Sequence, residues 1–468
     1  ANDFTGAVSI VSGKDVNLRD ANALILGATT ASGGLTLQSG GAITQTGTLS
    51  VSGTTGITAG ANDITLSNAA NDFTGAVSIV SGKDVSLKDS TGGITIGSSN
   101  VSGNLTVDYR SNAGGITLAG TITKDSGADA TLTFWSFGTI LLDENSAIKA
   151  TSGKLNTVLR TDTDIDGDYI HLKPGASIST GGGHIWMGGG GVSTLWNGLT
   201  VGNGYAVGTA AMTNGVYLQG ATLTSGGGHI ALYGRSHSGA AVDDQAAGIR
   251  LASTADKGAG IDAGTGSIVL DGESQGTSGW AIGVEFNSAA GKTVTVASAA
   301  TSGDAIAITG DAGGASSATG RRGVSIDGQT AISATGGGNI VVKGHSSTEE
   351  SIYMSGGTLS SGGGNLTLVS DIINLDEVAR ISGAGVLTIQ PWQEWEEIGI
   401  AGGAGKLQLP ADYFSTNFVD GFSGITIGWS NAGPITTGGN FAIRDDMTLK
   451  SGGDITIGAG LSWEGANK

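Results

Sequence analysis

Residues 1–20 read ANDFTGAVSIVSGKDVNLRD, and residues 70–89 read ANDFTGAVSIVSGKDVSLKD. The two segments match at eighteen of twenty positions, and they differ only where Asn17 becomes Ser86 and Arg19 becomes Lys88. A truncated echo, ANDITL at residues 61–66, lies between them. Self-similarity at a fixed offset, here the interval from Ala1 to Ala70, is typical of a stacked array in which each repeat contacts its neighbours.

Outside this pair, glycine groups precede short apolar-x-apolar runs. The three-glycine examples are TGGGHIWM at 180–187, SGGGHIAL at 225–232, TGGGNIVV at 335–342 and SGGGNLTL at 361–368. Strand-like runs such as Leu35-Thr36-Leu37 alternate with period two, which places one side chain inward and the next outward. Runs this short fit coils of about 20–25 residues with two or three strands each.

The sequence therefore predicts an all-β fold, a right-handed parallel β-helix (solenoid) of roughly 20 coils. On this reading the interval from Ala1 to Ala70 is near three coils of about 23 residues, and the interval from Gly181 to Gly226 is near two coils. We expect residues 1–384 to form a continuous shaft, 385–430 an aromatic-rich irregular insertion with a short helical turn at 411–418, and 431–468 further coils.

Composition excludes several classes of protein. The chain has 86 glycines among 468 residues, four prolines and no cysteine, so thiolate metal sites and thiol nucleophiles are excluded. The formal charge of −18 opposes nucleic-acid binding. No run of 18 apolar residues is present, and the first residues lack the pattern of a signal peptide. Because neither end reads as a polar cap, we expect the full protein to continue on at least one side.

The strings NDFTGAVSI, NALILGATTASGGLTLQSGGAITQTGTLSVSG and GITAGANDITLSNAANDFTG resemble the repeat regions of large secreted proteobacterial exoproteins of the filamentous-haemagglutinin type. The later run LTIQP…IGIAGGAGKLQLP…GFSGITIG…GPITTGGNF is similar to the distal part of such exoproteins. The resemblance implies a β-helical shaft exported through an outer-membrane pore and used in attachment, aggregation or biofilm. The family's N-terminal secretion domain is absent from this sequence.

One acidic stretch is a candidate metal site. Asp162, Asp164, Asp166 and Asp168 alternate with other residues, and Gly167 permits a bend, as in the first half of an EF-hand calcium loop. Lys173 stands where that loop would carry a bidentate glutamate. The alternative is an acidic, solvated turn. Calcium is accordingly the only cofactor that the sequence suggests.

The repeat pattern predicts a structural role for two histidines. His184 and His229 occupy the repeat position that Asn339 and Asn365 fill elsewhere, which predicts a polar turn row hydrogen-bonded from coil to coil. Glycoside cleavage would need two converging carboxylates, and residues 243–244, Asp371 and residues 394–397 supply acids without a spacing that singles out a pair. Arg321-Arg322 is the only basic doublet.

Trp392 and Trp395, within PWQEWEE at 391–397, are the best candidates for carbohydrate contact, because indole faces stack on sugar rings and the flanking carboxylates accept hydrogen bonds from hydroxyl groups. The alternative is local packing. We expect a non-enzymatic structural and adhesive segment of a cell-surface or secreted bacterial protein. Its expected partners are a host-cell or matrix receptor or an exopolysaccharide, other copies of the shaft, and a secretion pore. A polysaccharide-active enzyme or carbohydrate-binding module on the same fold is the alternative.

Overall fold

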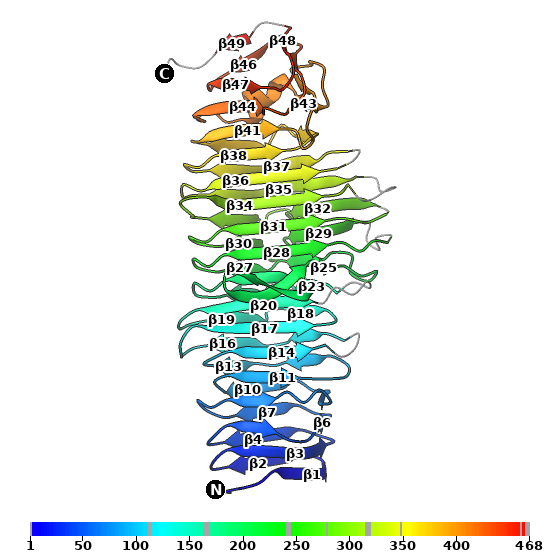
Figure 1. The fold of residues 1–468 in the computed structure, drawn as a ribbon, viewed down its shortest axis with the longest axis vertical. Coiled ribbons are helices and arrows are strands. Elements are labelled where there is room, and N and C mark those ends of the chain that lie inside the picture. Colours follow the sequence, from blue (N-terminus) through cyan, green and yellow to red (C-terminus); the bar gives the residue numbers. More distant parts are fainter. Residues whose placement is uncertain are drawn as a thin grey trace. The chain divides into compact units, whose positions relative to one another are not determined.

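The computed structural model describes residues 2–110, 114–161, 168–239, 245–277, 279–313, 320–346, 349–458 and 461–463. The chain divides into unit 1, residues 1–206 with 221–229, and unit 2, residues 207–220 with 230–468. Within each unit, parallel β-strands wind in successive coils, and each coil pairs with the next (Figure 1). The prediction of an all-β, parallel β-helix is confirmed.

Unit 1 has two parallel sheets, and the chain alternates between them. The first sheet contains β1 (Val8–Gly13), β3 (Leu24–Ala31), β5 (Ile43–Gln45), β6 (Leu49–Val51), β8 (Ile64–Leu66), β9 (Asp72–Phe73), β11 (Val85–Lys88), β14 (Leu105–Tyr109), β17 (Ala130–Ser136), β20 (Leu155–Thr161) and β23 (Ile185–Trp196). The second contains β2 (Val16–Asp20), β4 (Leu35–Ser39), β7 (Thr55–Thr58), β10 (Val77–Ser81), β12 (Ile94–Ile96), β13 (Ser99–Val101), β15 (Ile116–Leu118), β16 (Thr121–Lys124), β18 (Ile140–Leu142), β19 (Ala147–Ala150), β21 (Ile170–Leu172), β22 (Ser177–Ser179) and β27 (Thr222–Thr224).

Unit 2 repeats this arrangement. Its first sheet contains β28 (Ile230–Arg235), β31 (Ile268–Glu273), β34 (Asp304–Asp311), β36 (Asn339–His345), β38 (Leu366–Val369), β41 (Val386–Gln390), β44 (Gly424–Gly428) and β47 (Met447–Lys450). Its second contains β26 (Val216–Gln219), β29 (Gln245–Ala252), β30 (Ala259–Asp262), β32 (Trp280–Asn287), β33 (Val294–Ser298), β35 (Arg322–Ala334), β37 (Ile352–Ser361), β39 (Ile373–Leu375) and β40 (Arg380–Gly383).

The interior of each unit is built from apolar rows in register. In unit 2 one row runs through Ile230, Ile268, Ile306, Ile340, Leu366, Leu387 and Ile425, which pair in sequence from coil to coil. Every member of that row is buried. Period-two alternation puts these side chains inside, and burying each contributes roughly 1.5–3 kcal/mol relative to exposure.

The two near-identical segments of the repeat occupy opposite sheets. Val8 lies in β1 of the first sheet, whereas its counterpart Val77 lies in β10 of the second. Local contacts are nevertheless the same in both copies: Phe4 N–H donates to Asp20 over 3.2 Å, and Phe73 N–H donates to Asp89 over 2.9 Å.

The prediction that the repeat offset equals three coils is wrong, because the coils are shorter than expected. Ile43 pairs with Ile64, Ile64 with Val85, and Val85 with Leu105, so each coil closes before the expected length is reached. The offset is a half-integral number of coils, which is why the two copies lie in different sheets.

The long interval between the glycine groups at 181 and 226 is also one coil rather than two. Ser177 pairs directly with Thr222, and Ile185 N–H donates to His229 O over 2.9 Å. The extra length is an antiparallel hairpin of β23 with β24 (Leu199–Gly204), turned at Asn197 and Gly198 with positive φ. Glycine spacing alone does not distinguish such an excursion from a further coil.

The predicted polar turn row is confirmed. At this turn, a side-chain acceptor on several coils takes the backbone N–H of the equivalent residue on the next coil. Asn339 Oδ1 accepts from Asn365 N over 3.0 Å, and His184 Nδ1 accepts from His229 N over 2.9 Å. Asp84 does the same for Asn104 over 2.8 Å.

A glycine row forms another corner in unit 2. Gly234, Gly272, Gly310 and Gly344 lie in register at the ends of four first-sheet strands. A Cβ at Gly272 would collide with the backbone carbonyl of Gly283, and one at Gly310 with that of Gly323. The two sheets therefore touch backbone to backbone here, which only glycine allows.

The region 385–430 contains both coil strands and an excursion. β41 and β44 continue the first sheet of unit 2, while β42 (Ile398–Ile400), β43 (Leu407–Leu409), β45 (Ile435–Thr437) and β48 (Ile455–Ile457) form a separate four-stranded sheet. β46 (Phe441–Ile443) pairs with β49 (Leu461–Trp463). The predicted helical turn is confirmed as a π-helix, Tyr413–Asn417.

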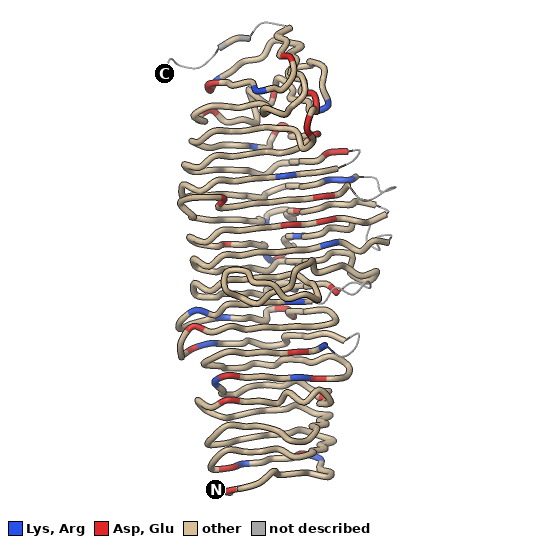
Figure 2. Tube along the Cα trace, in the orientation of Figure 1, with Lys and Arg blue, Asp and Glu red and all other residues tan. Residues whose placement is uncertain are grey.

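Charged residues are sparse in the fold, as Figure 2 shows, and residues 21–62 carry none. Among the described residues, no helix is long and apolar enough to cross a membrane.

Candidate functional site

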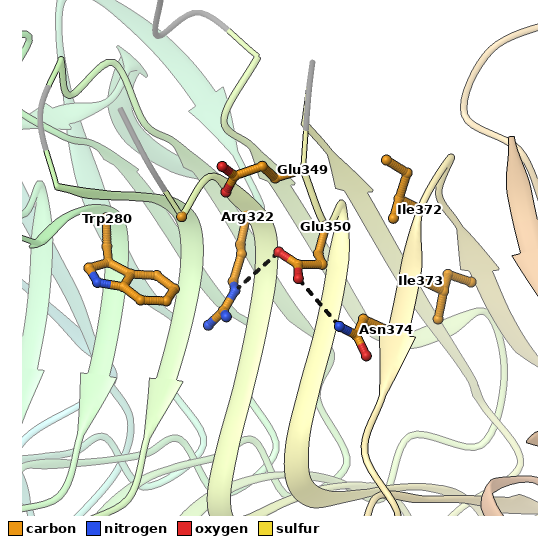
Figure 3. Close-up of a pocket in the computed structure, with 8 residues that line it drawn as sticks. Trp280, Arg322, Glu349, Glu350, Ile372, Ile373 and Asn374 are labelled. Carbon is orange, nitrogen blue, oxygen red and sulfur yellow. Dashed lines mark hydrogen bonds and ion pairs between the residues drawn. The ribbon is translucent and has the colours of Figure 1, made fainter. Parts of the chain in front are cut away.

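The glycine corner of unit 2 positions a surface groove. The strand that follows each glycine-containing strand in the chain belongs to the second sheet, where β32 begins at Trp280 and β35 at Arg322. Side chains at these strand starts line an open groove of about 560 Å³ with Glu349, Glu350 and Asn374 (Figure 3). Tight backbone packing at the corner is thus what brings residues far apart in sequence side by side.

The centre of the groove is a guanidinium held between two aromatic rings. Arg322 Cζ lies 3.4 Å from the Tyr353 ring centroid and 4.4 Å from that of Trp280. The backbone of Gly320, with φ of +72°, packs against the Trp280 ring where a Cβ would collide. Stacking fixes the orientation of the guanidinium, and 39% of Trp280 stays exposed.

Arg322 retains hydrogen-bonding capacity. Within the described residues its Nε is buried without a hydrogen-bond partner, and Glu350 Oε2 lies 3.8 Å from it, too far for a direct bond. Its Nη1 donates to Ser325 Oγ over 3.3 Å. Glu350 accepts a hydrogen bond from Asn374 Nδ2 over 3.3 Å. Figure 3 shows the side chains of Arg322, Glu350 and Asn374 next to one another, with Glu350 in the middle.

The groove lies on a longer polar face of the second sheet of unit 2. One residue from each of six strands pairs in register along it: Tyr217, Arg250, Glu285, Ser325, Tyr353 and Asn374. Arg250 Nε lies 3.0 Å from Glu285 Oε2, although the angle is not that of a hydrogen bond and both atoms are buried. Tyr217 and Arg250 line a second hollow of about 200 Å³. Glu285 and Ser325 are buried, whereas Tyr217 and Arg250 open into the second hollow and Asn374 into the groove.

This arrangement suits binding of a polar, uncharged ligand. Exposed aromatic surface stacks on apolar ring faces, while an oriented arginine, carboxylates and an amide exchange hydrogen bonds with hydroxyl groups. A buried donor without a partner is costly unless something supplies the missing bond.

The structure places the two predicted tryptophans in different surroundings. Trp392 is half-buried, with its ring stacked on His345 at a centroid distance of 5.1 Å. Trp395 is 64% exposed and adopts a positive φ of 60°. Trp392 therefore packs as the local-packing alternative expects, while Trp395 keeps an open face.

The remaining acids near them have local partners. Asp371 is fully buried and accepts from Trp392 N over 2.8 Å and from Lys406 Nζ over 3.2 Å. Lys406 also bonds Glu396 over 3.2 Å, and Glu394 accepts from Asn431 over 3.0 Å. These hydrogen bonds and ion pairs hold the segment that contains Trp392 and Trp395 against the coils.

Most of the predicted calcium-binding aspartates, and one of the acidic pairs, lie outside the part of the chain that the structure describes. Asp162, Asp164 and Asp166 lie outside the described residues, as do residues 243–244, whereas Asp168 is described and half-buried. Among the residues that the structure describes, no cluster of three or more histidines and acids forms a metal-binding group.

Sequence reasoning missed the groove, although a signal was present. Four strands end in the same pattern, apolar-x-Gly followed by a charged residue or histidine: LYGR at 232–235, LDGE at 270–273, ITGD at 308–311 and VKGH at 342–345. This repeated pattern coincides with the glycine corner, and the residues that line the groove come after it in the chain. The doublet Arg321-Arg322 stands out in the sequence only by its charge.

Comparison with known proteins gives one finding. Residues 13–80 and 82–156 match the model of a family described as repeats of unknown function, DUF5649. Both stretches lie in unit 1 and together cover less than half of the chain. Searches of curated proteins and of solved structures found no match.

Proposed function

We propose that this chain is a structural and adhesive segment of a secreted or cell-surface bacterial protein, which holds ligands at the surface of its coils and does not turn them over. The observation that carries the proposal is the parallel coil-to-coil pairing of strands within each unit, with apolar rows buried inside. A backbone ladder of this kind resists extension, and its stability is close to a sum of neighbour terms.

Three further features support the proposal. The repeat strings resemble filamentous-haemagglutinin-type exoproteins, whose shafts serve attachment and biofilm. The absence of cysteine and the low proportion of charged residues, 13%, suit export of an unfolded chain through an outer-membrane pore. The groove of unit 2 is open to solvent, as a surface for reversible binding would be.

Adhesion under flow tests this function. Beads coated with the full chain are passed over host cells, exopolysaccharide films and bare glass, with albumin-coated beads as the control. We expect retention on at least one biological surface at shear stresses that release the control beads. Equal release from all surfaces would contradict the proposal.

A second candidate, a polysaccharide-cleaving enzyme, is favoured by one observation. Burial raises the pKa of Asp327 to about 6, with Ser325 Oγ donating to its carboxylate over 2.8 Å. A carboxyl group with such a pKa is suited to general acid catalysis. Turnover of neutral or acidic polysaccharides that is lost in Asp327→Asn would support this enzyme and replace the adhesive proposal.

A further inference from the structure

We propose that the groove around Arg322 binds a linear, neutral oligosaccharide that lies along the stacking direction of the coils. This assignment rests on the proposed adhesive function and gives that function a ligand class and a place. It is carried by three independent features of unit 2: an arginine and a carboxylate that lie too far apart for a direct hydrogen bond, the balance of charge, and the placement of the groove residues on successive coils.

The spacing of Arg322 and Glu350 favours a ligand that carries hydroxyl groups. Arg322 Nε has no partner in the described part of the chain, and Glu350 Oε2 is an acceptor 3.8 Å away. Nε itself is buried, whereas the two side chains as a whole stay 11% and 27% exposed and both line the groove. A ligand hydroxyl can accept from the guanidinium and donate to the carboxylate at the same time. A carboxylate or phosphate ligand could only accept, and so would leave Glu350 unsatisfied.

Charge balance selects a neutral sugar. Among the described residues that line the groove, Arg322 is the single cation, and Glu349 and Glu350 are both anions. A uronic-acid or sulfated chain would bring further negative charge next to these two carboxylates, in a chain that already carries −18. The exposed part of Trp280 offers apolar surface for the face of an uncharged pyranose ring.

The order of the groove residues gives the ligand its direction. Figure 3 shows Trp280, Arg322, Glu350 and Asn374 side by side, and they come from successive coils whose strands pair at a spacing of about 4.8 Å. That spacing is close to the length of one pyranose residue in an extended chain. These four coils therefore present a track of about 14 Å along which successive sugars meet successive side chains.

The test is titration calorimetry of the full chain with neutral hexose and N-acetylhexosamine oligomers of two to six units, and with uronic-acid oligomers of equal length. We expect affinity for a neutral series to rise with length. Trp280→Ala should weaken binding about tenfold, and Glu350→Gln should weaken it less. Trp395, which the sequence predicts as a carbohydrate contact, is exposed but does not line the groove, so Trp395→Ala should bind as the unmodified chain does if the groove is the binding site.

Other outcomes overturn the assignment. Binding of uronic-acid oligomers only, or loss of binding in Trp395→Ala but not in Trp280→Ala, would do so. If Trp280→Ala lowers the melting temperature of the protein, the affinities of Trp280→Tyr and Glu350→Gln for the oligosaccharide are measured instead. Unchanged affinity in both variants would contradict binding in this groove. Beads that adhere under flow while no oligomer binds would leave the adhesive function standing and remove only the glycan assignment.

Discussion

His184 and His229 stack with ring planes 3° apart and centroids 5.2 Å apart, and the backbone N–H of His229 donates to His184 Nδ1 over 2.9 Å. Because the two residues belong to adjacent coils of unit 1, the imidazole makes the bond that an asparagine amide makes between Asn339 and Asn365. The bond requires the neutral ring, since a protonated Nδ1 cannot accept.

Replacing His184 by asparagine should preserve stability near neutral pH and improve it in acid. Burial, followed by the charges of His229 and Lys154, lowers the pKa of His184. The unfolded chain therefore binds the proton more readily, and the free energy of unfolding falls as pH drops below about 6.5. His184→Asn has no such contribution, so its melting temperature should exceed that of the unmodified chain increasingly between pH 7 and 5.

The control is His184→Ala, which removes the acceptor for His229 N–H. It should cost about 1 kcal/mol at pH 7.5, where the asparagine variant is nearly neutral. Equal stability of the alanine and asparagine variants would show that the coil-to-coil bond contributes nothing.

Gly272→Ala should destabilise unit 2 by about 1–3 kcal/mol, because the new methyl group meets the backbone carbonyl of Gly283 rather than a movable side chain. Gly56→Ala is the control, since Gly56 lies in β7 with open space around its Cβ position and ordinary φ. Chemical unfolding of both variants checks this. A tolerated Gly272→Ala would mean that the two sheets separate easily at the corner.

Two aspartates of the repeat should give opposite pH dependences. Burial raises the pKa of Asp89 to about 6, so its ionisation destabilises the fold as pH rises from about 4 to 6. The backbone N–H of Asn104 is the main cause that lowers the pKa of Asp84, which therefore stabilises the fold above its ordinary pKa and loses that contribution in acid.

Relative to the unmodified chain, Asp89→Asn should gain stability between pH 4 and 7, and Asp84→Asn should lose it as pH rises through about 4. Melting temperatures measured across that range test both. Parallel pH profiles for the two variants would contradict the assigned environments.

The Asp162–Asp168 stretch gives a prediction from sequence alone. If it binds calcium, a chelator should lower the melting temperature and calcium, but not magnesium, should restore it. Asp164→Asn should abolish the response. An unchanged melting curve with chelator would reject the site.

The fold followed from local patterns, because period-two alternation and repeated glycine groups determine which side chains face inward, whatever coil they belong to. The His184/Asn339 equivalence followed in the same way, since the same turn recurs. By contrast, the length of a coil did not follow from local patterns. The interval from Ala1 to Ala70 fits three longer coils as well as a half-integral number of shorter coils. Only the pairing of Val77 in the second sheet distinguishes the two possibilities.

The groove depended on non-local geometry. Trp280, Arg322 and Tyr353 are far apart in the chain and meet because the row containing Gly272 and Gly310 stacks in register. No spacing within the sequence expresses that juxtaposition, whereas Trp392 and Trp395 attract notice because they lie close together in the chain.

The most direct test of the central claim is the shear stress needed to release beads coated with the full chain from a film of the neutral glycan it binds in solution, compared with beads carrying Trp280→Ala. We expect the variant to detach at markedly lower stress, and soluble oligomer to release the unmodified beads to the same level. Identical detachment of the two, or degradation of the film by the unmodified chain, would contradict adhesion through this groove.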